Sequence, residues 1–124
     1  MALIRLRTTP RISGVVIAGG IAYLSGQVPS NLDADIEHQT LEVLGKIDML
    51  LTESGIARDR LLNATIYLKD MDDFDLMNHV WEGWLAAGGA PARTTVQANM
   101  AKSSCLIEIT VQAHAGQPDY LQSC

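Results

Sequence analysis

Two side chains in the C-terminal third of the chain have the chemistry of a hydrolytic site. Arg93 follows Pro91 and Ala92 at the start of one β-branched stretch, and Glu108 is the single carboxylate in the apolar stretch 106–111. An arginine presents a planar pair of donors that fits a carboxylate, and a glutamate can hold or activate a water. A cation beside such an acid suits the hydrolysis of a small molecule that carries a carboxylate.

The elements expected to position these residues follow from hydrophobic periodicity. The predicted helices cover residues 33–54 and 72–87, and the predicted strands cover residues 2–8, 14–18, 21–25, 62–69, 93–100 and 106–114. This order is typical of an α+β fold with one mixed sheet and both helices on one face. A second copy of the chain is the simplest cover for the other face, and a trimer would supply it.

The last two predicted strands are separated by the short loop of residues 101–104. We expect them to form an antiparallel pair that places Arg93 and Glu108 near one end of the sheet. The hypothesis of a shared site requires both side chains to lie on the same side of the sheet, because successive residues of a strand face opposite ways. An ordinary cross-strand ion pair is the alternative interpretation.

Length, charge and hydropathy limit the class of protein. The chain has 124 residues and a formal net charge of −5, without a run of lysine and arginine. The length predicts one domain, residues 1–124, and the charge argues against nucleic acid and anionic membrane as partners. No stretch approaches the roughly 20 apolar residues of a membrane span, and the N-terminus does not resemble a signal peptide. We therefore expect a cytoplasmic protein.

Cysteines and histidines give no sign of a metal or redox centre. Cys105 and Cys124 are expected as free thiols, since a disulfide to the last residue would restrain little of the chain. The histidines His38, His79 and His114 lack the spacing of metal ligands. The acidic residues that precede the second predicted helix, within residues 70–75, are interpreted as helix-capping groups and not as a calcium loop. No metal site is expected.

Four short motifs, taken together, resemble those of one protein family. They are residues 25–29 (SGQVP), residues 67–74 (YLKDMDDF) with Asn78 in the next turn, residues 91–96 (PARTTV), and residues 107–109 (IEI). In this order and at these spacings they resemble the Rid family of YjgF-type reactive-intermediate deaminases over nearly the whole chain. Residues 11–13 (RIS) and 31–35 (NLDAD) are more similar to its YoaB-like branch.

The resemblance implies a chorismate-mutase-like α+β fold and a homotrimer with a ligand cleft at each subunit interface. It implies hydrolysis of 2-enamines and 2-imines to 2-oxo acids and ammonia without a cofactor. Arg93 would hold the substrate carboxylate and Glu108 would position the water. The expected substrate-binding residues are Arg93, Thr95, Ser25, Gly26, Asn78 and Trp81. The expected ligand is an imino or 2-oxo acid.

Two departures from the family pattern leave a second function open. Residues 11–14 (RISG) contain no tyrosine where the best-studied branch has one that closes the pocket, and Thr95 stands where a cysteine is common. A trimer that binds small carboxylates in the same clefts without turning them over is therefore the alternative hypothesis. A ribonuclease activity fits poorly, because the chain is acidic and has no basic groove.

Overall fold

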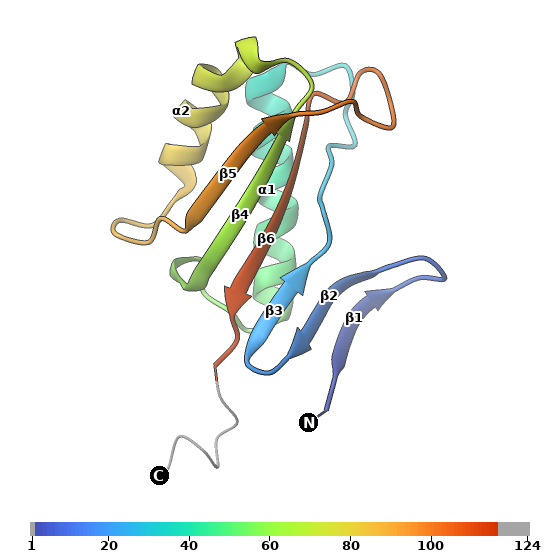
Figure 1. Ribbon diagram of the computed structural model, residues 1–124, viewed down its shortest axis with the longest axis vertical. Helices are drawn as coiled ribbons and strands as arrows, with labels where there is room; N and C mark the ends of the chain where they lie inside the picture. Colours follow the sequence, from blue (N-terminus) through green and yellow to red (C-terminus); the bar gives the residue numbers. More distant parts are fainter. Residues whose placement is uncertain (1, 117–124) are drawn as a thin grey trace.

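The computed structural model describes residues 2–116, so the prediction for Cys124 lies outside the described residues. Six strands and two α-helices follow one another in the predicted order (Figure 1). The strands are β1 (Ile4–Thr8), β2 (Ser13–Ala18), β3 (Ile21–Leu24), β4 (Leu61–Leu68), β5 (Ala92–Gln97) and β6 (Ile107–His114). The helices are α1 (Ile36–Glu53) and α2 (Phe74–Trp84).

All six strands form one mixed sheet in the order β1-β2-β3-β6-β4-β5. β4 and β5 are parallel, whereas β6 is antiparallel to both β3 and β4. The predicted antiparallel pair of the last two strands is therefore wrong, because β4 lies between them. The physical reason is the connection: α2 carries the chain from β4 across one face and back to a parallel neighbour, as a βαβ crossover does.

Both helices pack on the same face of the sheet, as the sequence pattern predicts. α1 buries a continuous apolar stripe that includes Val43, Leu44 and Ile47, and these residues meet buried side chains of β4 and β6. The side chain of Asp35 caps the first turn of α1 by accepting the backbone N–H of His38. Gly55 follows the helix with a φ of 71°, the left-handed conformation that ends many helices.

The second helix is shorter than predicted. It ends at Trp84, and the following residues form an irregular segment that includes Gly88, whose φ is 74°. At its start, the residue preceding the helix is Asp73 and not Asp72, and its side chain makes no capping hydrogen bond. Asp70 is the capping residue instead: its side chain accepts the backbone N–H of Asp72 in the 3-10 turn Met71–Asp73 that leads into α2. Apolar contacts also hold the helix, since Met77 and Trp81 are buried in the core.

No helix of the described chain covers the other face of the sheet (Figure 1). Tyr23 and Val96 are 45% and 38% exposed. Their registers place them on the same face as Tyr67, since Tyr23 aligns with Gln112 of β6 and Val96 aligns with Tyr67. We call this surface the open face.

Candidate functional site

The two residues expected to share a site lie on opposite faces of the sheet. Arg93 aligns with Ala64 of β4, which is fully buried beneath the helices. Glu108 aligns with Tyr67 of the same strand, and the two β4 positions lie three residues apart, an odd step. Side chains at such positions face opposite ways. Arg93 therefore faces the helices and Glu108 faces the open side, which contradicts the expected common side.

The two residues are also offset along the strands. Tyr67, the neighbour of Glu108, aligns with Val96, three positions beyond Arg93 on β5. At about 3.3 Å per residue, this offset is roughly 10 Å along the sheet. The two residues therefore form no cross-strand ion pair within one chain, and the alternative structural interpretation is also wrong.

Arg93 lies in a half-buried corner between β5 and α2. Its Nη1 donates a 2.7 Å hydrogen bond to Oδ1 of Asn78. The guanidinium carbon lies 5.7 Å from the ring centre of Phe74 and 5.8 Å from that of Trp81. Within residues 2–116, no carboxylate lies within ion-pair distance of it. A neutral amide and two aromatic rings thus hold the Arg93 guanidinium in this corner. None of them neutralises its positive charge, so the guanidinium can still bind an anion.

Thr95 belongs to the same side of the sheet as Arg93. It aligns with Ile66, which is fully buried under the helices. Its Oγ1 is buried and has no hydrogen-bond partner in the described part of the chain. Buried hydroxyls are normally paired, so this one stands out as a group able to bind a ligand. We call Asn78, Trp81, Arg93 and Thr95 the arginine corner.

Glu108 lies where the loop after β3 meets the start of β6. A Cβ added to Gly26 would come within 2.1 Å of Oε2 of Glu108, so glycine at this position is what leaves room for the carboxylate. Glu108 borders two hollows of about 410 and 400 Å³. The larger lies between residues 28–32 and residues 100–105, and the smaller adjoins Tyr67 and Thr110 on the open face.

Ser25 adjoins this second region. Its hydroxyl donates to the carbonyl of Ser13 on β2. The next residues are held to β6 by a backbone bridge in which Gln27 and Ile109 exchange hydrogen bonds of 2.8 and 3.1 Å. We call Ser25, Gly26 and Glu108, with the two hollows, the glutamate cleft. The seven predicted site residues therefore divide into two groups, one on each side of the sheet.

Sequence reasoning missed several polar residues that hold the arginine corner. Oδ2 of Asp48 on α1 accepts hydrogen bonds of 2.9 Å from the indole N–H of Trp84 and from Arg58. The Arg58 guanidinium stacks on the Trp84 ring, which in turn lies 5.6 Å from the Trp81 ring. This network fixes the end of α2 to α1. One signal in the sequence could have indicated this network: Asp48 is a charged residue directly after Ile47, a member of the apolar stripe of α1.

Two kinds of feature are absent from residues 2–116: a metal site and a membrane-spanning helix. No group of three or more histidine, cysteine or acidic side chains has the geometry of a metal site. Neither helix in this range combines the length and the apolar character that crossing a bilayer requires.

Residues 5–115 match the protein family described as Endoribonuclease L-PSP. The RutC family protein YoaB of Escherichia coli is 42% identical over 113 residues, which cover 91% of this chain and 98% of that protein. A RutC family protein of Haemophilus ducreyi is 40% identical over 88% of this chain and 93% of its own length. The crystal structure of a YjgF family member from Neisseria meningitidis superposes with a TM-score of 0.89 at 41% identity, covering 95% of this chain and 98% of that one.

These similarities span nearly the whole sequence and the whole fold, and the resemblance to the YoaB-like branch is confirmed. The chain belongs to the YjgF/RutC family.

Proposed function

We propose that this protein hydrolyses 2-imino and 2-enamino acids to 2-oxo acids and ammonia, without a cofactor, in sites shared between two copies of the chain. The observation that carries the proposal is the uncompensated guanidinium of Arg93. It is half-buried, oriented by Asn78 and flanked by aromatic rings, with no carboxylate of residues 2–116 beside it. Such a group binds a small carboxylate strongly, because partial exclusion of water strengthens the charge-assisted hydrogen bonds.

The chemical step needs little more than orientation and a water molecule. The carbon of a protonated imine is already electrophilic. In the proposed reaction, Glu108 accepts a proton from water as the oxygen bonds to that carbon. Glu108 returns this proton to the carbinolamine nitrogen, and ammonia leaves as the C=O bond forms and the hydroxyl proton passes to Glu108. The ammonia then takes up this proton as ammonium. A 2-enamino acid enters the same route after it takes a solvent proton at C3. Fixing the substrate carboxylate on Arg93 supplies the orientation, and general base assistance supplies the rest.

The opposite-face arrangement fixes how such a site must be assembled. One chain cannot place a single small substrate against both Arg93 and Glu108, so we propose that the arginine corner of one copy meets the glutamate cleft of another. A closed ring of copies would repeat this contact at every interface, and a homotrimer is the ring we propose. The uncovered sheet face supports association, since it exposes Tyr23 and Val96. We propose a cytoplasmic location for this assembly.

A subunit-mixing experiment tests this arrangement. Arg93→Ala and Glu108→Gln proteins are each expected to be inactive with imino acids generated by an amino-acid oxidase. When the two variants are unfolded together in equal amounts and refolded, about a quarter of the shared sites pair an intact Arg93 with an intact Glu108. Recovery of about a quarter of the wild-type rate is therefore expected.

The outcomes separate the hypotheses. The mixture could stay inactive while wild-type protein refolded alone recovers its rate. That result would show that Arg93 and Glu108 of a working site do not come from two different copies. If wild-type protein does not accelerate oxo-acid formation from any imino acid but binds 2-oxo acids through Arg93, the protein is a carboxylate-binding module. The lack of a tyrosine in residues 11–14 is the observation that favours this second function.

A further inference from the structure

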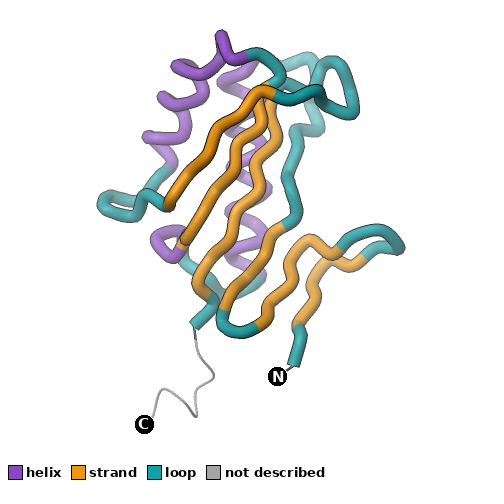
Figure 2. The backbone as a smooth tube through the Cα atoms, viewed as in Figure 1, coloured by secondary structure: helices purple, strands orange, loops and turns teal. Residues whose placement is uncertain are grey.

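The segment between β3 and α1 forms one wall of the larger hollow at Glu108. Figure 2 shows it as a long loop that runs along β6 towards the loop that precedes β6. Val28, Pro29, Ser30 and Leu32 line the hollow of about 410 Å³ that Glu108 also borders. Apart from the bridge at Gln27, this wall makes no strand pairing, so its position depends on other contacts.

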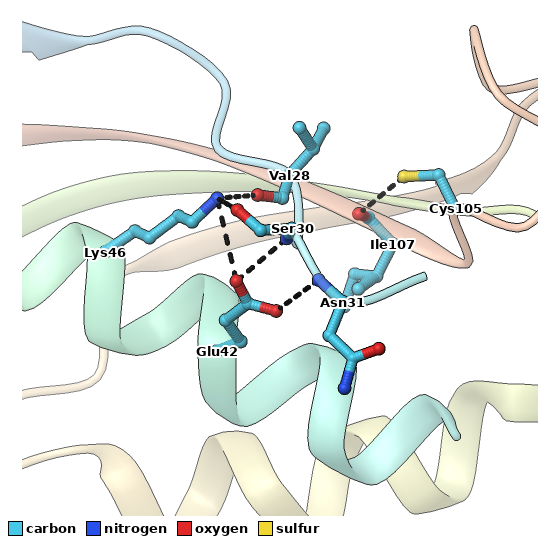
Figure 3. Close-up of polar contacts among 7 residues, drawn as sticks. All are labelled: Val28, Ser30, Asn31, Glu42, Lys46, Cys105 and Ile107. Carbon is cyan, nitrogen blue, oxygen red and sulfur yellow. Dashed lines mark hydrogen bonds and ion pairs between the residues drawn. The ribbon is translucent and has the colours of Figure 1, made fainter. Parts of the chain in front are cut away.

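Two charged side chains of α1 supply those contacts (Figure 3). The Glu42 carboxylate accepts the backbone N–H of Ser30 at 2.8 Å and of Asn31 at 3.0 Å, one on each oxygen. Lys46 donates from Nζ to the carbonyl of Val28 at 2.7 Å and to Oγ of Ser30 at 2.8 Å. The two side chains are one helical turn apart and lie 3.8 Å from each other.

We call Glu42 and Lys46 the clamp: of their four hydrogen bonds to the loop, three go to backbone groups and one goes to the hydroxyl of Ser30. The side chains are about 30% exposed, 31% for Lys46 and 30% for Glu42. The hydrogen bonds from Asn31 and then Ser30 lower the pKa of Glu42, so the carboxylate is ionised at neutral pH. An ordinary surface ion pair holds only its own two side chains, whereas this pair binds three positions of the loop, Val28, Ser30 and Asn31, to α1.

The wall is thus fixed at both ends. At one end Gln27 is bonded to Ile109, the residue after Glu108, and Gly26 leaves the space that the Glu108 carboxylate occupies. At the other end the Glu42–Lys46 pair holds Ser30 and Asn31 on α1. A shift of the clamped end would move the wall relative to Glu108. The clamp lies on α1, on the same side of the sheet as the arginine corner, but it shares no residue with that corner.

We propose that Glu42 and Lys46 are positioning residues for Glu108: they hold the wall of residues 28–31 so that the carboxylate and its water face the substrate carbon in line. This inference rests on the proposed function, since it assigns to the clamp a role in the water-delivering half of that site. It predicts that damage to the clamp lowers the rate of the chemical step and leaves binding of the carboxylate unchanged.

Glu42→Gln is the most informative variant. The amide keeps the size of the side chain but offers only one oxygen, so one of the two loop N–H groups loses its acceptor. We expect kcat to fall on the order of tenfold, because small displacements of a reacting group cost that much or more. KM and the Kd for a 2-oxo acid should stay within about twofold. Lys46→Met should lower kcat in the same way, and Lys46→Arg, which keeps donors, should restore most of it.

The control is Glu53→Gln on the same helix, which removes a carboxylate that pairs with Arg7 on β1. It should change neither kcat nor KM. Equal losses of kcat in Glu42→Gln and Glu53→Gln, or a rise in KM without a fall in kcat, would overturn the positioning role. A purely structural clamp would reduce the amount of folded protein, so kcat is calculated per ligand-binding site, with the sites counted by calorimetry. If Glu42→Gln does not fold, Lys46→Met takes its place.

Amide hydrogen exchange makes the inference testable even if the wild-type protein turns over no imino acid. In that case the proposed function fails on its own measurement. The clamp still predicts that Glu42→Gln speeds exchange at residues 26–31 by at least about tenfold, because loop amides exchange through local opening. Exchange in α2 should be unchanged. Unaltered exchange at residues 26–31 would show that the pair does not fix the wall, and this result would sink the inference independently of catalysis.

Discussion

The arginine corner and the glutamate cleft differ in charge and in the side chains that surround the charged group. The corner surrounds a cation with a neutral amide and the rings of Phe74 and Trp81, on a sheet face packed under a helix. The cleft places the Glu108 carboxylate against Gly26 at the edge of two hollows. The loop of residues 28–31, held by hydrogen bonds to α1, forms one wall of the larger hollow. The corner is suited to hold a ligand and the cleft to leave space for a reacting water. Under the proposed function, the two faces of one sheet would then divide ligand binding and water delivery between them.

Removing the cation is the harshest way to break this division. Arg93→Ala deletes the group proposed to bind the substrate carboxylate, so kcat/KM should fall by about 10³ or more, as expected when both affinity and orientation are lost. Binding of a 2-oxo acid should become undetectable by calorimetry. Arg60→Ala, at an exposed arginine that precedes β4, should have no effect. Retained oxo-acid binding in Arg93→Ala would place the carboxylate elsewhere.

Removing the acid should affect turnover and spare binding. Glu108→Gln preserves the shape of the side chain but cannot accept a proton, so kcat should fall by about 10² while the Kd of a 2-oxo acid changes by less than about threefold. Steady-state kinetics and calorimetry on the same preparation measure the two quantities. A parallel loss of affinity would mean that Glu108 contacts the ligand directly and that the division between the faces is not clean.

A methyl group at Gly26 tests the cleft without removing any functional group. Its Cβ would overlap Oε2 of Glu108, and the flexible carboxylate can swing away at small cost to the fold. Gly26→Ala should therefore lower kcat by roughly tenfold or more with little change in stability. Gly45→Ala is the matched control: no atom lies within 4 Å of its added Cβ. This change in α1 should stabilise the fold by up to about 1 kcal/mol and leave activity unchanged.

The smallest expected effect concerns the start of α2, which carries the arginine corner. Burial, followed by the charges of Asp70 and Asp72, raises the pKa of Asp73 above its usual 3.8. A carboxyl whose pKa is raised in the folded state destabilises the fold once it ionises, and this cost is absent at pH values below 3.8.

Asp73→Asn should therefore raise Tm at neutral pH, by at most about 2 °C, and the gain should vanish in acid. Thermal unfolding followed by circular dichroism at both pH values measures it, and an equal gain at both would exclude a charge effect. Activity should not change, which would show that the corner depends on its own contacts and not on the acidic turn before it.

Most of the fold could be predicted from the sequence because each element carries a local signal. The apolar steps of α1 and the two glycines between β2 and β3, with φ values of 59° and 81°, are such signals, and both predictions are confirmed. The residues of β5 do not reveal which strand it pairs with, since a β-branched strand can pair with β4 as well as with β6. The signal lay in the connections, because a strand, a helix and a strand in succession favour a parallel pair. The short loop expected at residues 101–104 favoured a hairpin instead, but β5 ends at Gln97 and β6 begins only at Ile107.

The candidate site was predicted as a set of residues but not as a shape. The motifs identified Arg93 and Glu108, whereas the side of the sheet on which each lies follows from pairings between distant strands. The clamp residues Glu42 and Lys46 gave only the pattern of an ordinary i,i+4 pair on a helix surface. Three of their four partners are backbone groups of another segment, and no side-chain pattern encodes such contacts.

The position of the indole rings has a practical consequence. The chain contains two tryptophans, Trp81 and Trp84, which lie 5.6 Å apart beside the arginine corner. Tryptophan emission of the unlabelled protein, excited selectively over that of its three tyrosines, therefore comes from beside this corner. The arrival of a carboxylate at Arg93 would change the surroundings of Trp81 directly, so the association rate of a ligand can be followed by stopped-flow emission in the wild-type protein, separately from any chemistry at Glu108.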